Sequence, residues 1–377
     1  MTKVEEINSI EQLDDYRLLW NSLHADTRQP TFFQSLDWLQ TYWRHFGEQQ
    51  RLKLMVVSCL GETLGMLPLV VRHEKTRIGD LRVLTYPLHD WGSYFGPIAP
   101  NPTATLIGAM DYLAVNRRDW DMLDLRWVDQ RGCDFGRTRN AMRRAGLSVR
   151  ESVWKQVALV DLKDDFDAYL ANRPAKFRQE IRRCRRRAEE QGEVRLIRHR
   201  PDPFTHGGGD PRWDLFDQCI ALAEKSWQSS AQSGTTLCSP DARDYFRDAH
   251  ELAARTGAVD MSVLQIGEAP VAYTYNYHCD GVVQGIRSGY DPQYRKLGVG
   301  GLILAEMIRD SYERGDRLID LGFDYLDIKR HWLTRLGESF RYTHYPMSSP
   351  RGQILRIAHW ARGKLGRDRE GAKAQQA

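Results

Sequence analysis

The chain has 377 residues, of which 41% are hydrophobic and 28% are charged. This composition is ordinary for a globular protein with a sizeable core, and the length suits two domains. No apolar run reaches the roughly 18 residues that a membrane-spanning helix needs. The N-terminal sequence MTKVEEINSIEQ has no secretory signal pattern, so we expect a cytoplasmic protein.

The charge of the chain is unevenly distributed. Residues 173–200 contain eleven Lys or Arg and four Glu, so this segment carries seven of the net positive charges and the remainder is slightly acidic. The six cysteines are scattered and form no CxxC or CxxH pair. This spacing argues against a disulfide framework and a structural zinc site, so we expect free thiols and no metal.

The first half of the chain predicts alternating helices and strands from apolar periodicity. Ser35 is a plausible N-cap of one helix, and Gly47 a plausible stop. Gly61 and Glu62 form a turn between two strand-like runs. The predicted elements are helices at 9–24 and 35–47, strands at 52–60 and 63–71, a helix at 103–115, a strand at 120–128, a helix at 133–146 and a strand at 154–162.

The second half repeats this order after the basic segment. Ser239 is predicted to cap a helix that has Pro240 in its first turn and stops at Gly257. The predicted elements are helices at 213–227 and 239–257, strands at 261–268, 269–281 and 282–291, a helix from the glycine-rich stretch to about 314, and strands at 317–323 and 339–347.

Two Gly-Glu hairpins suggest an internal duplication. Gly61-Glu62 and Gly267-Glu268 each join two apolar strands, with helices before and a helix and a strand after. We therefore predict two copies of one mixed α/β unit. The proposed organisation is an N-terminal repeat at 1–165, a basic helical connector at 166–195, a C-terminal repeat at 196–348, and a basic C-terminal helix and tail at 349–377.

The stretch YDPQYRKLGVGGLILA at 290–305 lies between a predicted strand and a predicted helix. Glycines allow close approach of a ligand to the backbone, and the first turn of a helix offers unpaired N–H groups to a pyrophosphate. The sequence fits neither the P-loop pattern nor the dinucleotide GxGxxG pattern. A loop whose glycines serve only the turn is the alternative.

Arg295-Lys296-Leu297-Gly298-Val299-Gly300 fits the Q/R-x-x-G-x-G/A signature of the GNAT acyltransferase superfamily. The chain further resembles one branch, the CelD/BcsL-type acetyltransferases, which are related to the Fem transferases. FFQSLDWLQTYWRHFG (32–47) is similar to the N-terminal pattern of that branch, KFRQEIRRCRRRAEEQG (176–192) to its basic helix, and DLGFDYLDIKRHW (320–332) to its D-x-x-x-G-x-x-x-Y-K-x-x-W segment.

This resemblance implies an α/β (mixed α+β) fold of tandem GNAT-like repeats, each a mostly antiparallel sheet flanked by helices. It also implies acetyl-CoA or another acyl-CoA as donor. The N-terminal repeat lacks the glycine-rich signature, so one donor site is expected, in the C-terminal repeat. The residues implied for it are Ser288, Gly289, Tyr290, Arg295, Lys296, Leu297, Gly298, Val299, Gly300 and Gly301.

Four residues near the end of the strand RLIDLGF are candidates for catalysis. Asp320 or Asp324 would act as a base or orient the acceptor, Tyr325 would protonate the thiolate, and Lys329 would stabilise an oxyanion. Helix caps, a packed aromatic and a surface lysine are the alternatives. Asp324 and Ile328 depart from the Gly and Tyr usual in the family. Trp227 is expected to pack in the core.

The basic helix would bind an anionic substrate through Lys176, Arg178, Arg182 and Arg183, or would only present a solvated charged face. Its anionic partner would be the phosphate of CoA, a nucleotide-sugar or lipid-linked acceptor, tRNA, or a membrane surface at which the protein is peripheral. No aromatic interleaving indicates sequence-specific nucleic-acid binding. The tail, with Ile354 and Ile357 on one side, would dock on the body or contact a membrane.

The expected function is acyl-CoA-dependent N- or O-acyl transfer to a sugar, glycan or cell-envelope precursor in exopolysaccharide or cellulose biosynthesis, an assignment that rests on the resemblance. A Fem-like aminoacyl-tRNA-dependent transferase and a catalytically degenerate accessory protein are the alternatives.

Overall fold

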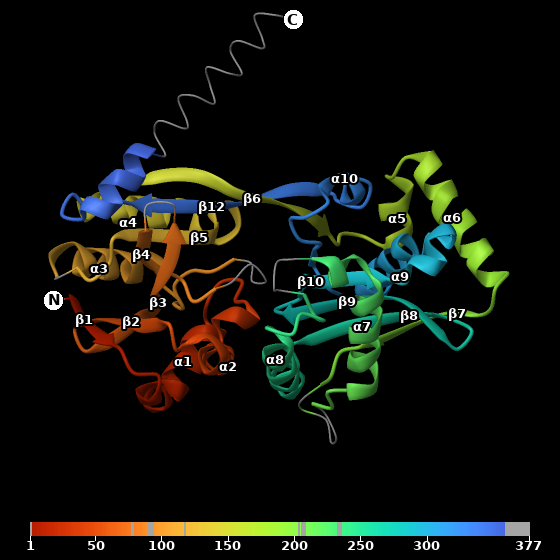
Figure 1. The fold of residues 1–377 in the computed structure, drawn as a ribbon, viewed down its shortest axis with the longest axis horizontal. Coiled ribbons are helices and arrows are strands. Elements are labelled where there is room, and N and C mark those ends of the chain that lie inside the picture. The colour runs from red at the N-terminus through yellow and green to blue at the C-terminus, as the bar shows by residue number, and fades with distance from the viewer. Residues whose placement is uncertain are drawn as a thin grey trace, which may run out of the picture.

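One long β-sheet organises the molecule (Figure 1). The computed structural model describes residues 2–76, 79–88, 94–116, 118–202, 204, 209–231 and 236–358. The strands within these ranges are β1 (Thr2–Ile7), β2 (Gln50–Cys59), β3 (Glu62–Thr76), β4 (Gly79–Thr85), β5 (Met122–Asp129), β6 (Arg150–Asp161), β7 (Val194–His199), β8 (Val259–Ile266), β9 (Ala269–Cys279), β10 (Val282–Tyr290), β11 (Leu318–Asp320) and β12 (Arg335–His344). Their order in the sheet is β1-β2-β3-β4-β5-β12-β6-β11-β10-β9-β8-β7.

Helices flank this sheet in both halves (Figure 1). The α-helices of the described residues are α1 (Arg17–Ala25), α2 (Leu36–Phe46), α3 (Pro102–Val115), α4 (Arg137–Arg144), α5 (Phe166–Ala171), α6 (Ala175–Glu189), α7 (Trp213–Lys225), α8 (Arg243–Arg255), α9 (Val299–Glu313) and α10 (Leu326–Lys329). Short 3₁₀ helices are η1 (Glu11–Tyr16), η2 (Phe32–Gln34), η4 (Trp227–Ser230) and η5 (Pro292–Leu297), and η3 (Gln130–Asp134) is one π-helical turn.

The strand order divides the sheet into an N-terminal repeat, β1–β6, and a C-terminal repeat, β7–β12, which exchange their last strands. The pairs β4–β5 and β10–β11 are the parallel ones and occupy equivalent places. The last strand of each repeat pairs with the fifth strand of the other, β12 with β5 and β6 with β11, and the two last strands pair with each other. Figure 1 shows β6 and β12 running side by side from one half to the other. The predicted tandem arrangement of mixed α/β units is confirmed.

Aromatic side chains also join the repeats, between η2 and α2 on one side and α8 and β9 on the other. The indole Nε1 of Trp38 donates a 2.9 Å hydrogen bond to the hydroxyl of Tyr245, and both rings are buried. Phe32 and Phe33 pack on Tyr277 with ring centroids 4.5 and 5.6 Å away. One hydrophobic core therefore continues from the first repeat into the second.

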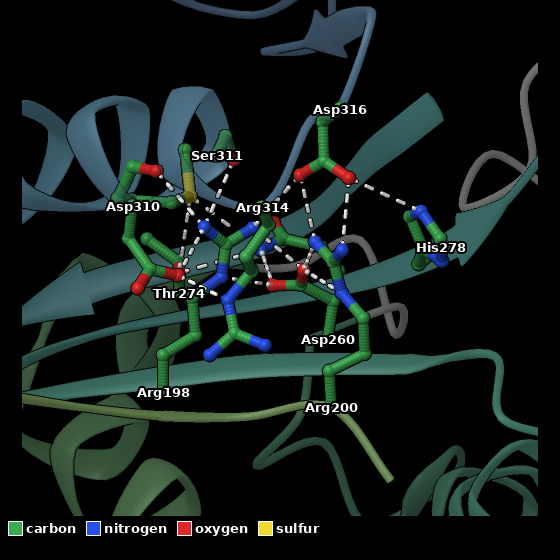
Figure 2. Close-up of polar contacts among 11 residues, drawn as sticks. Arg198, Arg200, Asp260, Thr274, His278, Asp310, Ser311, Arg314 and Asp316 are labelled. Atoms are coloured by element: carbon green, nitrogen blue, oxygen red, sulfur yellow. Dashed lines mark hydrogen bonds and ion pairs between the residues drawn. The ribbon is translucent and has the colours of Figure 1, made fainter. Parts of the chain in front are cut away.

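A buried ionic cluster fastens the edge strand β7 to the C-terminal repeat (Figure 2). Arg198 of β7 and Arg200, the residue directly after that strand, project toward Asp260 of β8, whose carboxylate is fully buried. Arg200 also donates two 2.8 Å hydrogen bonds to Asp316, which precedes β11. Arg198 donates to the carbonyl of Met307 in α9 at 2.9 Å. These two arginines were counted in the basic segment 173–200, but their charge is neutralised inside the protein.

The structure confirms most predicted elements and corrects some details. Ser35 caps α2 by accepting from the N–H of Trp38, and Gly47 is the C-cap. Ser239 does not cap α8, because the helix begins after Ala242; the carbonyl of Ser239 instead accepts the N–H of Ala242 in a turn that precedes the helix. Strands β1, β4 and β7 were not predicted.

The C-terminal segment docks on the body through a residue that was not predicted to do so. Residues 350–358 are helical, and Leu355 packs against a cluster of Leu81, Val83, Met122 and Tyr345. Ile354 and Ile357 are exposed, so the predicted apolar side does not face the body; the remainder of the predicted tail helix lies outside the described residues. No helix in the described ranges combines the length and the apolar character needed to cross a membrane.

Candidate active site

Strand β10 runs past the end of its parallel neighbour β11 and so gains an open edge. The two strands pair only from Val282↔Leu318 to Gln284↔Asp320, whereas β10 continues to Tyr290. At Gly285, an added Cβ would lie 2.8 Å from the carbonyl oxygen of Asp320, so only glycine fits where the strands begin to diverge. The register against β9 shifts between Gly285 and Arg287, which marks a β-bulge at the same point.

The open edge carries backbone N–H groups from the predicted donor site. The N–H of Asp291 donates to Val271 on β9, and Gly289 pairs with Tyr273 on the same strand two residues earlier. Because antiparallel pairs alternate, Gly289 also faces β9, and the N–H groups of Ser288 and Tyr290 face the open edge. Two of the predicted residues are therefore placed where they would meet a ligand between β10 and β11.

The glycine-rich loop follows directly and forms an anion cradle. Gly298 adopts the left-handed conformation (φ 71°) and is the N-cap of α9. In the described part of the chain, no acceptor receives the N–H groups of Val299 and Gly300, which open the helix. A Cβ added to Gly298 would lie 2.5 Å from Cys184 Sγ of α6, and one added to Gly300 would lie 3.1 Å from the Tyr290 ring. Gly298 is thus favoured both by the turn and by close packing, whereas Gly300 is favoured by close packing alone.

The remaining loop residues either fix the conformation of the loop or add positive charge beside the N-terminus of α9. Asp291 accepts from the N–H of Gln293 and pairs with Lys225, which fixes the start of η5. Arg295 and Lys296 are exposed on η5, and neither forms an ion pair within the described residues. A 15-residue helix that begins with free N–H groups beside two free cations suits a pyrophosphate.

Asp320 is a buried carboxylic acid at the end of β11, next to the point of divergence. Its side chain is 2% exposed. Oδ1 accepts a 2.7 Å hydrogen bond from the N–H of Gly322, whereas Oδ2 is buried without a hydrogen-bond partner in the described residues. Burial raises the pKa of Asp320 to about 6, although the Gly322 N–H and the charge of Lys329 act against that increase. A carboxyl with such a pKa can act as a base near neutral pH.

Lys329 lies close to this carboxyl, on α10. Its Nζ would be 3.5 Å from a Cβ added to Gly322, which places the ammonium beside the loop after β11. Burial lowers the pKa of Lys329 to about 8, and the charges of Asp320 and Asp324 oppose that decrease. Asp324 itself is exposed, so of the two predicted carboxylates only Asp320 is shielded from water.

Trp227 and Tyr325 contact each other beside the end of β10, contrary to the expectation that Trp227 packs in the core. The Trp227 Nε1 donates a 3.3 Å hydrogen bond to the carbonyl of Ser288, and the tryptophan is 44% exposed. The Tyr325 ring lies against it in an edge-to-face contact, with centroids 5.6 Å apart. The alternative that Tyr325 is a packed aromatic therefore stays open, since the ring packs on Trp227 while its side chain is 58% exposed.

The basic helix is α6, and it packs beside the cradle. Cys184 and Ala188 of α6 share a core cluster with Val299 of α9. Lys176 and Arg182 are exposed, and Arg178 is half-buried; none of the three forms an ion pair in the described chain. Arg183 is bound to Glu180 at 2.7 Å, which reduces its availability to a ligand. The structure thus brings part of the predicted anionic-substrate set near the donor loop.

Sequence reasoning missed contributions from the N-terminal repeat. Asp129, at the end of β5, raises the pKa of Asp320 by charge repulsion and is itself a carboxyl whose pKa burial raises. Phe323, in the loop after β11, packs on Trp127 of β5 with ring centroids 5.2 Å apart. Only the exchanged pairing of the last strands brings these segments together, so no local signal could have found them. A surface depression on the same repeat, lined by Gln50, Arg51 and Arg82 among others, contains none of the predicted site residues.

The chain matches a known family over the region that contains this site. Residues 175–330 fit the family model described as an acetyltransferase (GNAT) domain. The protein is therefore an enzyme with an acyltransferase domain, and domains of this class act on an acyl-CoA donor and an acceptor. No curated protein matches the chain in sequence.

Two solved structures resemble the fold over nearly its full length. The crystal structure of FemX matches with a TM-score of 0.60 at 9% identity, covering 94% of this chain and 99% of that chain. The C-terminal domain (DUF2156) of a putative lysylphosphatidylglycerol synthetase from Agrobacterium fabrum matches with a TM-score of 0.54 at 10% identity, covering 93% and 97%. At these identities the likeness supports the tandem fold and says nothing of the substrate.

Proposed function

We propose that the protein transfers an acyl group from acyl-CoA to an amine or hydroxyl at the divergence of β10 and β11. The observation that carries this proposal is the cradle of α9, where the free N–H groups of Val299 and Gly300 stand beside Arg295 and Lys296. The pyrophosphate of the donor would bind there. Its thioester would then lie along the open edge, with the carbonyl oxygen accepting from the N–H groups of Ser288 and Tyr290.

In the proposed reaction, Asp320 accepts the proton of the attacking amine or hydroxyl. The new C–N or C–O bond forms at the thioester carbonyl carbon, the C–S bond breaks, and the CoA thiolate leaves. Lys329 is the proposed proton donor to that thiolate, because a pKa of about 8 favours release of a proton. Tyr325 is a second candidate for this step, and Asp324 would orient the acceptor from the rim.

Calorimetry with CoA tests the cradle. We expect wild-type protein to bind CoA and Gly300→Glu to abolish binding, because the carboxylate would occupy the pyrophosphate position. Gly315→Glu is the control for the added charge: Gly315 follows the other end of α9 and has open space around its Cα, and its positive φ of 74° adds a backbone strain that Gly300, inside the helix, does not have. Wild-type protein that binds no CoA at millimolar concentration would disprove the assignment.

For the acceptor we propose a sugar, glycan or cell-envelope precursor of exopolysaccharide or cellulose synthesis. Support comes from the resemblance of 32–47 and 320–332 to the CelD/BcsL-type acetyltransferases. The exposed cations of α6 fit the phosphates of a nucleotide-linked precursor. Turnover of acetyl-CoA with a panel of nucleotide-sugars, followed by mass spectrometry of the products, tests this class directly.

One observation favours a second candidate, a Fem-like aminoacyl-tRNA-dependent transferase. The cations Lys176, Arg178 and Arg182 lie on a helix that packs beside the donor loop, where a nucleic-acid backbone would be gripped. This candidate expects tRNA binding whose affinity falls steeply with salt. Filter binding at two salt concentrations decides it, and binding that is absent or insensitive to salt removes it.

A further inference from the structure

Three large apolar side chains stand exposed at the mouth of the candidate site. Trp227, Tyr325 and Ile328 are 44%, 58% and 66% exposed. They come from segments about one hundred residues apart in the chain, so local sequence does not explain why they gather. Tyr325 is the N-cap of α10 and Ile328 belongs to its single turn, where the N–H of Ile328 donates a 3.0 Å hydrogen bond to the carbonyl of Tyr325.

The Trp227–Tyr325 pair spans the gap where β10 and β11 diverge. On one side, Trp227 is tied to β10 through the carbonyl of Ser288. On the other side, Tyr325 belongs to the segment that continues from β11, and its ring contacts the indole. The apolar surface therefore lies along the same open edge on which the N–H groups of Ser288 and Tyr290 are available.

The fold does not require this exposure. Tyr325 has φ 56°, a conformation that costs free energy for a residue with a side chain. Within the described residues the Tyr325 hydroxyl makes no hydrogen bond, so no polar contact of that hydroxyl accounts for the position of the ring. An apolar patch held in place at a binding-site mouth indicates an apolar ligand.

We infer that Trp227, Tyr325 and Ile328 form an acyl-chain platform, and that the donor carries an acyl group longer than acetyl. This inference rests on the proposed function, because the group attached to the thioester carbonyl is the one that would lie beside Ser288. An acetyl group has a single methyl carbon and would leave most of the platform in water. A longer alkyl chain covers it and gains affinity with each CH₂ buried, by at most about fourfold.

Calorimetry with a chain-length series tests the platform. The probes are CoA, acetyl-CoA, butyryl-CoA and octanoyl-CoA, with no acceptor present. For wild-type protein we expect the dissociation constant to fall from acetyl-CoA to octanoyl-CoA by at least tenfold. In Ile328→Ser and in Trp227→Ser this dependence should shrink to less than threefold, while the affinity for CoA itself stays within about twofold of wild type.

Leu60→Ser is the matched control, since Leu60 is an exposed apolar residue on the β2–β3 hairpin of the other repeat. It should leave the chain-length dependence unchanged. Ile328→Ser keeps the test valid if Trp227→Ser fails to fold, because Ile328 is largely in solvent. Equal affinity of wild-type protein for acetyl-CoA and octanoyl-CoA would overturn the inference and leave the donor cradle standing. Absence of binding by every probe, CoA included, would overturn both.

Discussion

The backbone N–H of Gly322 donates a 2.7 Å hydrogen bond to Oδ1 of Asp320, while Oδ2 of the same carboxyl is buried with no partner in the described residues. A buried polar atom without a partner destabilises a protein and is uncommon in native structures. The unsatisfied oxygen lies where β10 and β11 diverge. An acceptor N–H or O–H would supply the missing hydrogen bond there.

We expect Asp320→Asn to reduce kcat/KM by about 10²–10⁴, since the amide cannot accept the proton. In wild-type protein, kcat/KM should rise with pH through an acid limb near 6, because burial raises the pKa of Asp320 to about that value. Steady-state rates between pH 5 and 8 measure the limb. Asp327→Asn, an exposed carboxylate on α10, serves as control and should keep it. An Asp320→Asn variant with the full wild-type rate would exclude the base assignment.

Asp320 should make the protein less stable as pH rises, whereas an aspartate in a salt bridge makes a protein more stable as pH rises. The pKa of Asp320 is higher in the folded chain than in the unfolded chain, so the folded state binds more protons between about pH 4 and 6 and stability falls as pH rises through that window. Asp320→Asn removes this effect. Relative to wild type, the variant should therefore gain about 3 kcal/mol between pH 4 and pH 7, measured by urea unfolding. A constant difference between the two proteins would contradict the raised pKa.

Lys329 predicts an alkaline limb of the rate profile. Burial lowers its pKa to about 8, so it loses its proton, and with it the proposed thiolate donor, above that pH. The pair then gives a bell-shaped profile with apparent values near 6 and 8. Lys329→Met should lower kcat by about 10–10². Lys329→Arg keeps its positive charge at pH 9, so in this variant any fall in rate that depends only on the loss of that charge should disappear. An unchanged alkaline limb in Lys329→Met would rule this role out.

Gly298 predicts a coupling between the donor loop and α6. Gly298→Ala combines the cost of a left-handed alanine, about 1–2 kcal/mol, with a clash against Cys184 Sγ at 2.5 Å. Gly315→Ala has a nearly equal φ and open space, so it reports the backbone cost alone. We expect Gly298→Ala to be more destabilising, and Cys184→Ala in that background to recover the excess. Additive effects in the double-mutant cycle would show that the clash is absent.

The buried ionic cluster (Figure 2) contacts the C-terminal end of α9, whereas the glycine-rich loop lies at its N-terminal end. Replacing an arginine of this cluster should greatly lower the free energy of unfolding. Arg198→Met leaves the buried Asp260 with fewer partners, and breaking a buried pair in this way costs about 3–5 kcal/mol. Arg314→Met breaks a half-exposed pair with Asp310 and should cost no more than about 1 kcal/mol. Urea unfolding at pH 7 compares the two. Similar losses in both variants would show that burial of the cluster adds nothing.

The sequence predicted well what depends on near neighbours. The helix between Ser35 and Gly47 and the hairpin with its turn at Gly267-Glu268 agree with the structure, because a cap, a stop and a two-residue turn act within a few residues. The other hairpin also forms, but its turn residues are Leu60 and Gly61, since Glu62 already pairs with Cys59. Helix α8 was placed correctly except at its start. There the carbonyl of Ser239 accepts the N–H of Ala242 three residues on, so a turn precedes the helix and α8 starts at Arg243.

Elements that depend on distant partners were missed. In the sequence, the residues of β7 look like the end of a basic segment. Arg198 and Arg200 are two residues apart, so both side chains lie on one face and pair with Asp260 and Asp316. That period of two was the available signal. The exposure of Trp227 depends on the carbonyl of Ser288, which no local pattern reveals. The strand, loop and helix around the glycine-rich stretch were thus predictable from the local sequence, whereas the carboxyl of Asp129, whose charge acts on Asp320, was not.

The exchange of last strands has a consequence for the history of this chain. Once each copy of the duplicated unit had lent its final strand to the other, deletion of either copy would strip the survivor's fifth strand of its neighbour. The N-terminal copy, which has no counterpart of the glycine-rich loop, then supplies the strand that pairs with β11 and the carboxyl of Asp129, whose charge acts on Asp320. Substitutions on its surface are tolerated more easily than substitutions in the four adjacent strands β5, β12, β6 and β11. In those strands a change in one copy requires a compensating change in the other.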